Sequence, residues 1–259
     1  MKKDRENFTR LVSIMEKLRS PQGCPWDREQ TMDTLKTYLI EEVYEIIEAI
    51  EEKDVDALRE ELGDLLFHIL FLSRIAEEQG AFNVWEVIDR ISKKMISRHP
   101  HVFGEKKVSS SPEVERNWSD IKQEEKRNRR SILDGIPPNL PALLRAYRIT
   151  QRASRVGFDW EKAGDIFQKL DEEVEELNQA LSQGHRPRIE DEVGDVVFVM
   201  VNVARLMGVN PEEALRKTTD KFVKRFQHIE KALTKSNRTL QEASLEEMDK
   251  LWEESKTKD

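Results

Sequence analysis

The sequence has few of the residues that interrupt helices or form cross-links, with ten glycines, nine prolines and one cysteine, Cys24, among 259 residues. A single cysteine excludes a disulfide within the chain and is typical of a reducing compartment. No apolar run approaches the roughly 18 residues that a membrane-spanning helix needs. The first ten residues, MKKDRENFTR, lack the apolar core of a signal peptide. These absences predict a soluble, cytoplasmic protein with no membrane partner.

Neither half of the chain is basic. The net charge is −8, and residues 1–130 hold 23 basic and 27 acidic residues of the totals 43 and 51, so each half carries −4. This balance excludes a basic nucleic-acid-binding arm, and no nucleic-acid partner is expected. The chain is 36% charged and 37% hydrophobic, which is typical of amphipathic helices. Because Thr, Val and Ile show no alternating run, an all-α fold is expected.

Apolar residues recur at helical spacing along most of the chain. In the first half, the expected helices cover residues 3–19, 31–52, 54–79, 83–98 and about 112–129. In the second half, they cover about 141–155, 161–182, 187–206, 210–235 and 244–256. Asp54 and Asn83 are residue types that cap helix N-termini, whereas segments 20–27, 99–112 and 156–160 are expected to be loops or turns. The centre of 54–79, LLFHILFL, is apolar nearly all round, which predicts a helix buried on most sides.

The two halves of the chain repeat one pattern. Two carboxylate pairs, EVYE and ELGD in the first half and EVEE and EVGD in the second, are separated by fifteen residues in both copies. Segment 131–143, SILDGIPPNLPAL, is rich in proline and is the predicted linker. We therefore expect a tandem repeat of two four-helix-bundle-like domains, 1–130 and 144–259. Their apolar faces can also pair with another subunit, so a homodimer is expected.

The paired carboxylates are the candidate metal ligands. Residues three apart lie on one face of a helix, so two antiparallel helices can direct four carboxylates at one point. Four clustered anions raise each other's pKa unless a cation lies among them, and ligands that are all oxygen suit Mg²⁺ or Mn²⁺. The alternative, a solvated acidic helix face, is weakened by the duplication at identical spacing. The eight residues are Glu42, Glu45, Glu61, Asp64, Glu173, Glu176, Glu192 and Asp195.

A glycine lies inside each carboxylate motif, at Gly63 and Gly194. Glycine inside a helix costs about 1 kcal/mol relative to alanine. Close approach of a neighbouring helix is therefore the expected reason for both.

Basic and aromatic residues repeat in register with the carboxylates. Lys and Arg four residues apart can hold phosphate oxygens, and a late tryptophan can stack on a nucleobase. The alternatives are surface ion pairs for the cations and core or interface packing for the tryptophans. The residues are Lys94, Arg98 and Trp118 in the first unit and Lys221, Arg225 and Trp252 in the second.

The second unit has two further cations without counterparts in the first. Lys169 and Arg188 each lie four residues before a motif carboxylate, on the same helix face. The first unit has Tyr38 and Ala57 at these positions. Because a triphosphate carries about four negative charges near neutral pH, extra cations favour triphosphate binding in the second unit. Pairing with nearby surface glutamates is the alternative.

The histidines have simpler interpretations. His68 lies one turn after Asp64 and is expected to pack, since Val199 replaces it in the second unit. His99 and His101 bracket a proline in a loop and have no second-unit counterpart, so metal binding there is not expected.

The motif residues resemble the E-x-x-E…E-x-x-D signature of the MazG nucleoside triphosphate pyrophosphohydrolases. GCPWD, RHPHVFG and GFDW also resemble segments of the full-length, two-domain bacterial members. The resemblance implies an all-α homodimer that hydrolyses nucleoside triphosphates to nucleoside monophosphate and pyrophosphate with Mg²⁺. It implies that the second domain is the main catalytic one. In that domain Glu173, Glu176, Glu192 and Asp195 would bind Mg²⁺, and Lys221, Arg225 and Trp252 would contact the nucleotide.

The residues also fit this chemistry directly. Cleavage between the α- and β-phosphates needs a water nucleophile and neutralisation of phosphate charge, which clustered metals supply. One carboxylate can act as general base, and Glu173 is our candidate. A di-iron carboxylate bundle is disfavoured because it uses Glu-x-x-His pairs, which neither unit has. A catalytically silent nucleotide- or metal-sensing module is the alternative from another class.

Overall fold

The computed structural model describes residues 2–111, 113, 114, 117, 118, 121, 131–160 and 162–257. The chain forms two compact units, Met1–Arg127 and Asn128–Asp259. Helices make up the regular structure of the described residues, which contain no strand. The prediction of a tandem all-α architecture is confirmed.

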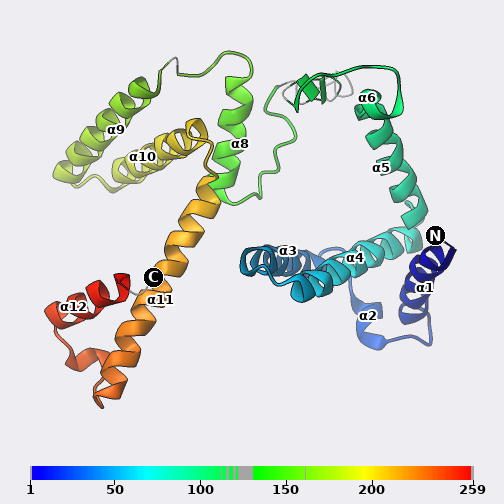
Figure 1. Ribbon diagram of the computed structural model, residues 1–259, viewed down its shortest axis with the longest axis horizontal. Coiled ribbons are helices and arrows are strands. Elements are labelled where there is room, and N and C mark those ends of the chain that lie inside the picture. Colours follow the sequence, from blue (N-terminus) through cyan, green and yellow to red (C-terminus); the bar gives the residue numbers. More distant parts are fainter. Residues whose placement is uncertain are drawn as a thin grey trace. The chain divides into compact units, whose positions relative to one another are not determined.

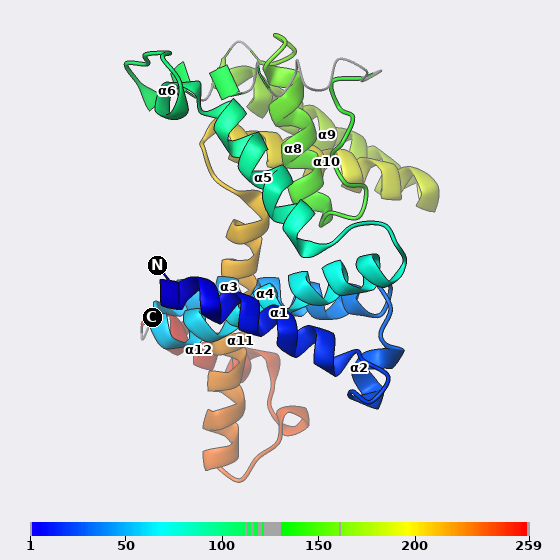
Figure 2. The same ribbon diagram turned by 90° about the vertical axis from the view of Figure 1, so that its right-hand side faces the viewer.

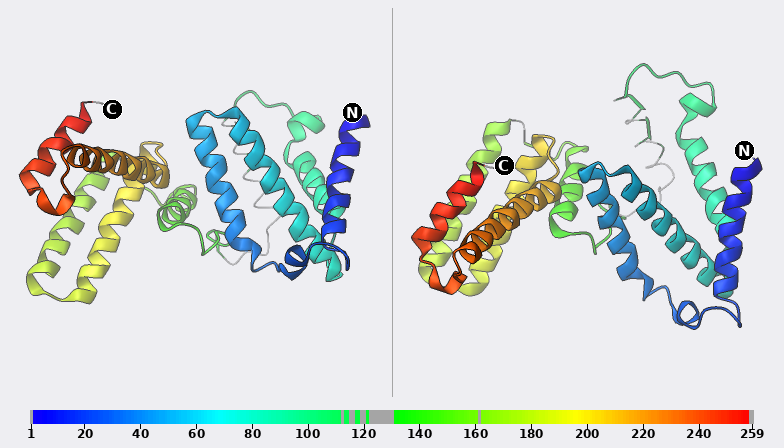
Figure 3. Two further views of the ribbon diagram at one scale, coloured as in Figure 1. Left: turned by 90° about the horizontal axis from the view of Figure 1, so that it is seen from below. Right: turned by 60° about the horizontal axis from the view of Figure 1, so that its bottom comes forward.

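The first unit is built around a helical hairpin. Helices α3 and α4 lie side by side, and α1 and α5 pack against α4 (Figures 1 and 3). Buried Met15, Leu35 and Phe71 belong to the core where α1, α3 and α4 meet. The helices are α1 (Lys2–Leu18), α2 (Pro25–Glu29), α3 (Leu35–Glu52), α4 (Val55–Glu78), α5 (Val84–Arg98) and α6 (Pro100–Phe103).

The second unit contains the equivalent hairpin, α9 against α10. Helix α8 packs against α10 (Figure 2), while α11 packs mainly on α12 and α8. The buried residues Ile166, Ala180 and Val201 are contributed by the hairpin. The helices are α8 (Ala142–Ser154), α9 (Ala163–Gln183), α10 (Arg186–Leu206), α11 (Pro211–Lys235), the 3₁₀ helix η1 (Leu240–Glu242) and α12 (Leu245–Lys256).

A two-residue connection joins the helices of each hairpin. Its first residue is left-handed, with φ of 58° at Lys53 and 65° at Gly184. Its second residue caps the next helix: Asp54 accepts hydrogen bonds from two backbone N–H groups of α4, and His185 accepts one from Arg188. Both connections are therefore two residues long and begin with a residue of positive φ. The two carboxylate pairs of each hairpin consequently lie at the same distance along the chain from the connection.

Most predicted helices are observed to within a few residues. Asn83 makes a full capping box with Glu86, which explains the start of α5. Two short helices, α2 and α6, lie in segments predicted to be loops. Both begin with proline, which fits the first turn of a helix but signals a break when read from sequence. The helix predicted at 112–129 lies largely outside the described residues.

Two expectations about close packing are wrong for the single chain. Helix α4 is not buried on most sides, because Leu62, Leu66 and Ile69 are at least one-third exposed. A Cβ atom added at Gly63 or Gly194 would have no neighbour within 4 Å. Close helix approach within the chain therefore does not explain either glycine. The apolar residues of α4 thus form a surface that this chain alone does not cover.

The predicted linker, 131–143, consists of turns leading into α8. Arg152 of α8 donates to the carbonyl oxygens of Ile132 at 3.2 Å and Asp134 at 2.7 Å, which holds the start of this segment against the second unit. The domain boundaries at 130 and 144 stay predictions. None of the described helices has the length and hydropathy needed to cross a membrane.

Candidate functional site

The α9/α10 hairpin brings three of the four second-unit carboxylates together. Glu173 and Glu176 lie one turn apart on α9, and Glu192 faces them from α10. One carboxylate oxygen of each lies within 4.8 Å of the others. Glu173 and Glu192 are buried, with 6% and 7% of their surface exposed, so their charges are poorly hydrated. This geometry can hold a cation.

Mutual repulsion changes the proton affinity of this cluster. The negative charge of Glu192 raises the pKa of Glu176 above its usual range, and burial adds to the effect. The pKa of Asp195 is raised by burial first and then by the charges of Glu173 and Glu192. Asp195 therefore lies in the field of the cluster, although it is outside the group of three that converge most closely. A bound cation would reverse these pKa shifts.

Lys169 and Arg188 lie against the cluster as their helical spacing predicted. Lys169 Nζ is 2.9 Å from Glu173 Oε1 and also 2.9 Å from Glu172 Oε1. Arg188 Nε is 3.4 Å from Glu192 Oε1. Hydrogen bonding to Glu173 raises the pKa of Lys169 above its ordinary value, so the ammonium stays charged. The two most buried carboxylates, Glu173 and Glu192, are thus each paired with a basic side chain.

The α3/α4 hairpin repeats the carboxylate arrangement. Ligand oxygens of Glu42, Glu45 and Glu61 lie within 4.8 Å of one another. The pKa of Glu61 is raised by burial and then by the charges of Glu45, Glu42 and Asp64. Asp64 again lies close enough to act through its charge without joining the converging group.

His68 does more than pack, in contrast to the sequence-based interpretation. Its Nε2 lies 3.2 Å from Glu42 Oε1, and its ring stacks on Tyr38 with centroids 6.0 Å apart. Glu42 Oε2 and His68 Nδ1 are buried and have no hydrogen-bond partner among the described residues. The one-turn spacing from Asp64 is the signal in the sequence that points to this contact. Val199, at the same place in the second unit, favours simple packing instead and so conceals it.

Both clusters fit a hard divalent cation. Their donors are carboxylate oxygens, the ligand type that Mg²⁺ and Mn²⁺ prefer. Three converging carboxylates that repel one another are more stable around a cation than without one. In the second unit Glu173, Glu176, Glu192 and Asp195 could hold the ion. In the first unit Glu42, Glu45, Glu61 and Asp64 could do so.

The basic and aromatic residues form a second group within each unit. Arg225 lies over the ring of Trp252 at 5.7 Å, and Phe222 contacts the same ring at a centroid distance of 5.1 Å. In the first unit Arg98 lies over Trp118 at 5.2 Å. The repeat therefore preserves an arginine–tryptophan pair as well as the carboxylates.

The residues of this second group lie outside the two carboxylate hairpins, on α5 and at Trp118 in the first unit and on α11 and α12 in the second. Helix α11 leads away from the α9/α10 hairpin, and α12 lies beside its far part (Figure 1). Lys221 and Lys94 are exposed on α11 and α5. That the carboxylates and the nucleotide contacts form one site stays a prediction for both units.

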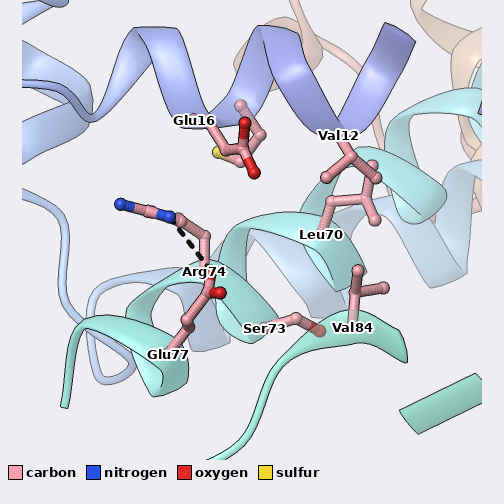
Figure 4. A pocket seen from close by; sticks show the side chains of 8 residues that line it. Val12, Glu16, Leu70, Ser73, Arg74, Glu77 and Val84 are labelled. Atoms are coloured by element: carbon pink, nitrogen blue, oxygen red, sulfur yellow. Dashed lines mark hydrogen bonds and ion pairs between the residues drawn. The ribbon is translucent and has the colours of Figure 1, made fainter. Parts of the chain in front are cut away.

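Two hollows are lined by described residues of the first unit. The smaller, about 20 Å³, lies between α1 and α4 and is lined by Val12, Leu70 and Arg74, the last paired with Glu77 (Figure 4). It has room for about one water molecule. The larger is an open depression of about 750 Å³ along α5 that includes Lys94. Neither is lined by a motif carboxylate.

His99 and His101 lie with their rings 5.7 Å apart. His99 Nδ1 is 2.7 Å from the carbonyl oxygen of Met95, which ties the ring to α5. Neither joins a group of converging metal ligands among the described residues.

The fold and its clusters define a class of protein: an all-α chain that repeats a helical hairpin bearing converging carboxylates. The family model described as "MazG nucleotide pyrophosphohydrolase domain" matches twice, at residues 30–103 and 163–230, and the chain belongs to this family. The two matches contain the two carboxylate hairpins.

Full-length relatives are similar. The chain is 48% identical over 96% of its length to the nucleoside triphosphate pyrophosphohydrolase/pyrophosphatase MazG of Thermotoga maritima, 95% of which is covered. It is 41% identical over 95% of its length to the nucleoside triphosphate pyrophosphohydrolase of Escherichia coli K12, 96% of which is covered. A crystal structure of a mazG-related protein from Thermotoga maritima matches 44% of this chain and 98% of that chain, with 32% identity and a TM-score of 0.39.

Proposed function

We propose that the protein hydrolyses nucleoside triphosphates to nucleoside monophosphate and pyrophosphate, with Mg²⁺ at the second-unit cluster. The observation that carries this proposal is the convergence of Glu173, Glu176 and Glu192 within 4.8 Å, with two cations beside them. The names of the Thermotoga maritima and Escherichia coli relatives support the same activity.

The chain's residues have distinct proposed roles. Glu173, Glu176, Glu192 and Asp195 hold the divalent ion, which neutralises phosphate oxygens and lowers the pKa of a water nucleophile. Glu173 is the candidate general base, because it is the most buried carboxylate of the cluster. Mn²⁺ can replace Mg²⁺ because the donors are oxygens.

The nucleotide contacts are proposed by position and charge. Lys169 and Arg188 are near enough to the cluster to meet the phosphates, and a guanidinium can do so with two bonds. Lys221, Arg225 and Trp252 are proposed to hold the phosphate tail and base. Lys94, Arg98 and Trp118 are their first-unit counterparts.

We infer that the protein acts as a cytoplasmic homodimer. Apolar residues of both hairpins remain exposed in the single chain, including Ile40, Leu62, Val197 and Met200, each more than two-fifths exposed. An uncovered apolar surface of this kind favours association with another copy.

The test is direct. The full chain is incubated with a nucleoside triphosphate and Mg²⁺, and the products are separated. Equal amounts of nucleoside monophosphate and pyrophosphate, abolished by EDTA and restored by Mg²⁺ or Mn²⁺, are expected. Release of inorganic phosphate and nucleoside diphosphate would contradict the proposed bond cleavage. Binding of nucleotide without any product would support the alternative, a silent sensing module.

A further inference from the structure

The two units hold the same carboxylates but neutralise them differently. In the second unit Lys169 is 2.9 Å from Glu173, and Arg188 is 3.4 Å from Glu192. Tyr38 and Ala57 occupy these positions in the first unit, where Glu42 has the imidazole of His68 as its partner instead. The second-unit cluster is therefore ion-paired with a lysine and an arginine, whereas the first-unit cluster has neither residue at the equivalent positions.

We propose that Lys169 and Arg188 are exchangeable counter-ions that couple metal binding to triphosphate binding in the second unit. Without metal they neutralise Glu173 and Glu192. When a divalent ion takes those carboxylates, the ammonium and guanidinium groups are released to bind the phosphates. This inference rests on the proposed function. It adds that metal binding releases the two cations and that the affinities for metal and triphosphate are coupled.

The exposure of the side chains supports this exchange. The carboxylate side chains are nearly buried, with 8% of Glu173 and 10% of Glu192 exposed. The side chains of Lys169 and Arg188 are 38% and 41% exposed, so each borders solvent. The cations can thus turn away while the carboxylates stay in place.

Charge balance explains why binding of the divalent ion and binding of the triphosphate should strengthen each other. Four carboxylates with two lysine or arginine cations carry a net charge of −2, which one divalent ion brings to zero. Metal alone must compete with Lys169 and Arg188 for the same carboxylates, and this competition weakens metal binding. Triphosphate binding stabilises the released cations and so removes the penalty. By linkage, metal must strengthen triphosphate binding by the same factor.

The first unit lacks this competition. Neither the imidazole of His68 nor the phenol of Tyr38 is the permanent cation that a lysine or arginine would supply to a phosphate. A divalent ion at Glu42, Glu45 and Glu61 therefore displaces no lysine or arginine among the described residues. Metal binding in this unit should be independent of nucleotide.

The experiment measures Mn²⁺ binding without nucleotide, from the electron paramagnetic resonance signal of the free ion. The full chain carries Glu45→Gln and Glu61→Gln, so that only the second cluster binds strongly. Adding Lys169→Met or Arg188→Met should tighten Mn²⁺ binding by about fivefold, the size expected for loss of one partly exposed ion pair. The same variants should bind an α,β-methylene triphosphate about tenfold more weakly in saturating Mn²⁺, because a phosphate contact is lost.

Two control variants separate counter-ion exchange from charge and folding effects. Arg186 is on α10 near Arg188, but it pairs with exposed Glu190 outside the cluster. Arg186→Met makes the same change in net charge and should leave Mn²⁺ binding unchanged. Lys169→Arg keeps the charge and should keep the affinity of the parent chain. Circular dichroism melts establish that each variant is folded.

Unchanged or weaker Mn²⁺ binding in folded Lys169→Met and Arg188→Met variants would overturn the inference. If wild-type protein still hydrolyses triphosphates in that case, the proposed function survives without the coupling. If wild-type protein neither binds Mn²⁺ nor hydrolyses triphosphates, both fail together. An equal gain in Mn²⁺ affinity from Arg186→Met would also overturn the inference, because it would reduce the effect to net charge.

Discussion

Single residues distinguish the two units more than their backbones do. Glu42 and Glu173 occupy equivalent places, yet the first is held by His68 and the second by Lys169. A lysine side chain remains charged at neutral pH. The second cluster therefore has permanent positive charge for a triphosphate, which supports the proposal that it is the better hydrolytic site.

Matched glutamine variants test this difference. Glu192→Gln should lower triphosphate hydrolysis by at least about 100-fold, the scale seen when one group that stabilises charge in a transition state is lost. Glu61→Gln, the equivalent change in the first unit, should keep most of the activity. Both rates are measured on the full chain at saturating Mg²⁺. A larger loss from Glu61→Gln, or equal losses from both, would contradict the asymmetry.

Metal-free stability should depend on pH through Glu176. Its folded-state pKa is raised by the charge of Glu192, so the folded protein binds its proton more tightly than the unfolded chain does. The resulting destabilisation is absent below the unfolded pKa of about 4.3 and develops as pH rises through the higher folded pKa.

In EDTA, Glu176→Gln should therefore melt at a higher temperature than wild type at pH 7 and at nearly the same temperature at pH 4. Saturating Mg²⁺ should remove the advantage of the variant at pH 7, because the cation neutralises the repulsion. Calorimetry at both pH values gives the comparison. A variant that is less stable than wild type at pH 7 without metal would show that Glu176 contributes structural contacts.

At the scale of elements, patterns within one helix were predictable and contacts between helices were less so. The caps at Asp54 and Asn83 and the carboxylate faces depend on neighbouring residues in sequence. The structure shows both caps and brings three of the four motif carboxylates of each unit together. The contact of His68 with Glu42 crosses from α4 to α3, and α11 diverges from α10. Such features depend on packing angles that one helix's periodicity does not contain.

An ion pair fastens the turn before α9 to α10. Arg205 Nη1 donates to Asp159 Oδ2 at 3.0 Å, and Nη2 donates to the other carboxylate oxygen. Hydrogen bonding to Arg205 lowers the pKa of Asp159. The pair therefore stabilises the fold above the unfolded pKa of about 3.9, and this contribution is lost as pH falls through the lower folded pKa.

Asp159→Asn should lower the free energy of unfolding at pH 7 by about 0.5–1 kcal/mol, the range for partly exposed ion pairs. The difference from wild type should shrink towards pH 3. Urea unfolding at both pH values measures it, with exposed Asp165→Asn as a control of equal charge change. An effect that stays constant between pH 7 and pH 3 would mean that the amide disturbs the turn by another route.

At the scale of the whole molecule, the exposed apolar surface is the feature that a single chain leaves unexplained. The sequence predicted that α4 would be buried on most sides, and Leu62, Leu66 and Ile69 remain exposed in one copy. Periodicity reports that a surface is apolar but does not say which chain covers it. The same limit applies to Gly63 and Gly194, whose Cβ positions are open within the chain.

The homodimer predicts a mass near twice 30.4 kDa in light scattering. Leu62→Glu should shift the protein towards the monomer mass while each copy stays folded, because Leu62 is already 51% exposed in one copy. Arg59→Glu, which also places a glutamate at an exposed α4 position, is the control and should leave the mass unchanged. A wild-type mass of one chain at all concentrations would refute the dimer.

The two-residue connections of the hairpins set how far each site tolerates insertions. Each residue added to or removed from a helix rotates the residues beyond it by about 100°. If one residue were inserted after Gly184 and the connection stayed two residues long, the extra residue would enter α10 and turn Glu192 away from Glu173. Lys53–Asp54 and Gly184–His185 differ in both residues but not in number. The number of residues in the connection should therefore matter more than their chemical identity, provided that the first residue can adopt a positive φ.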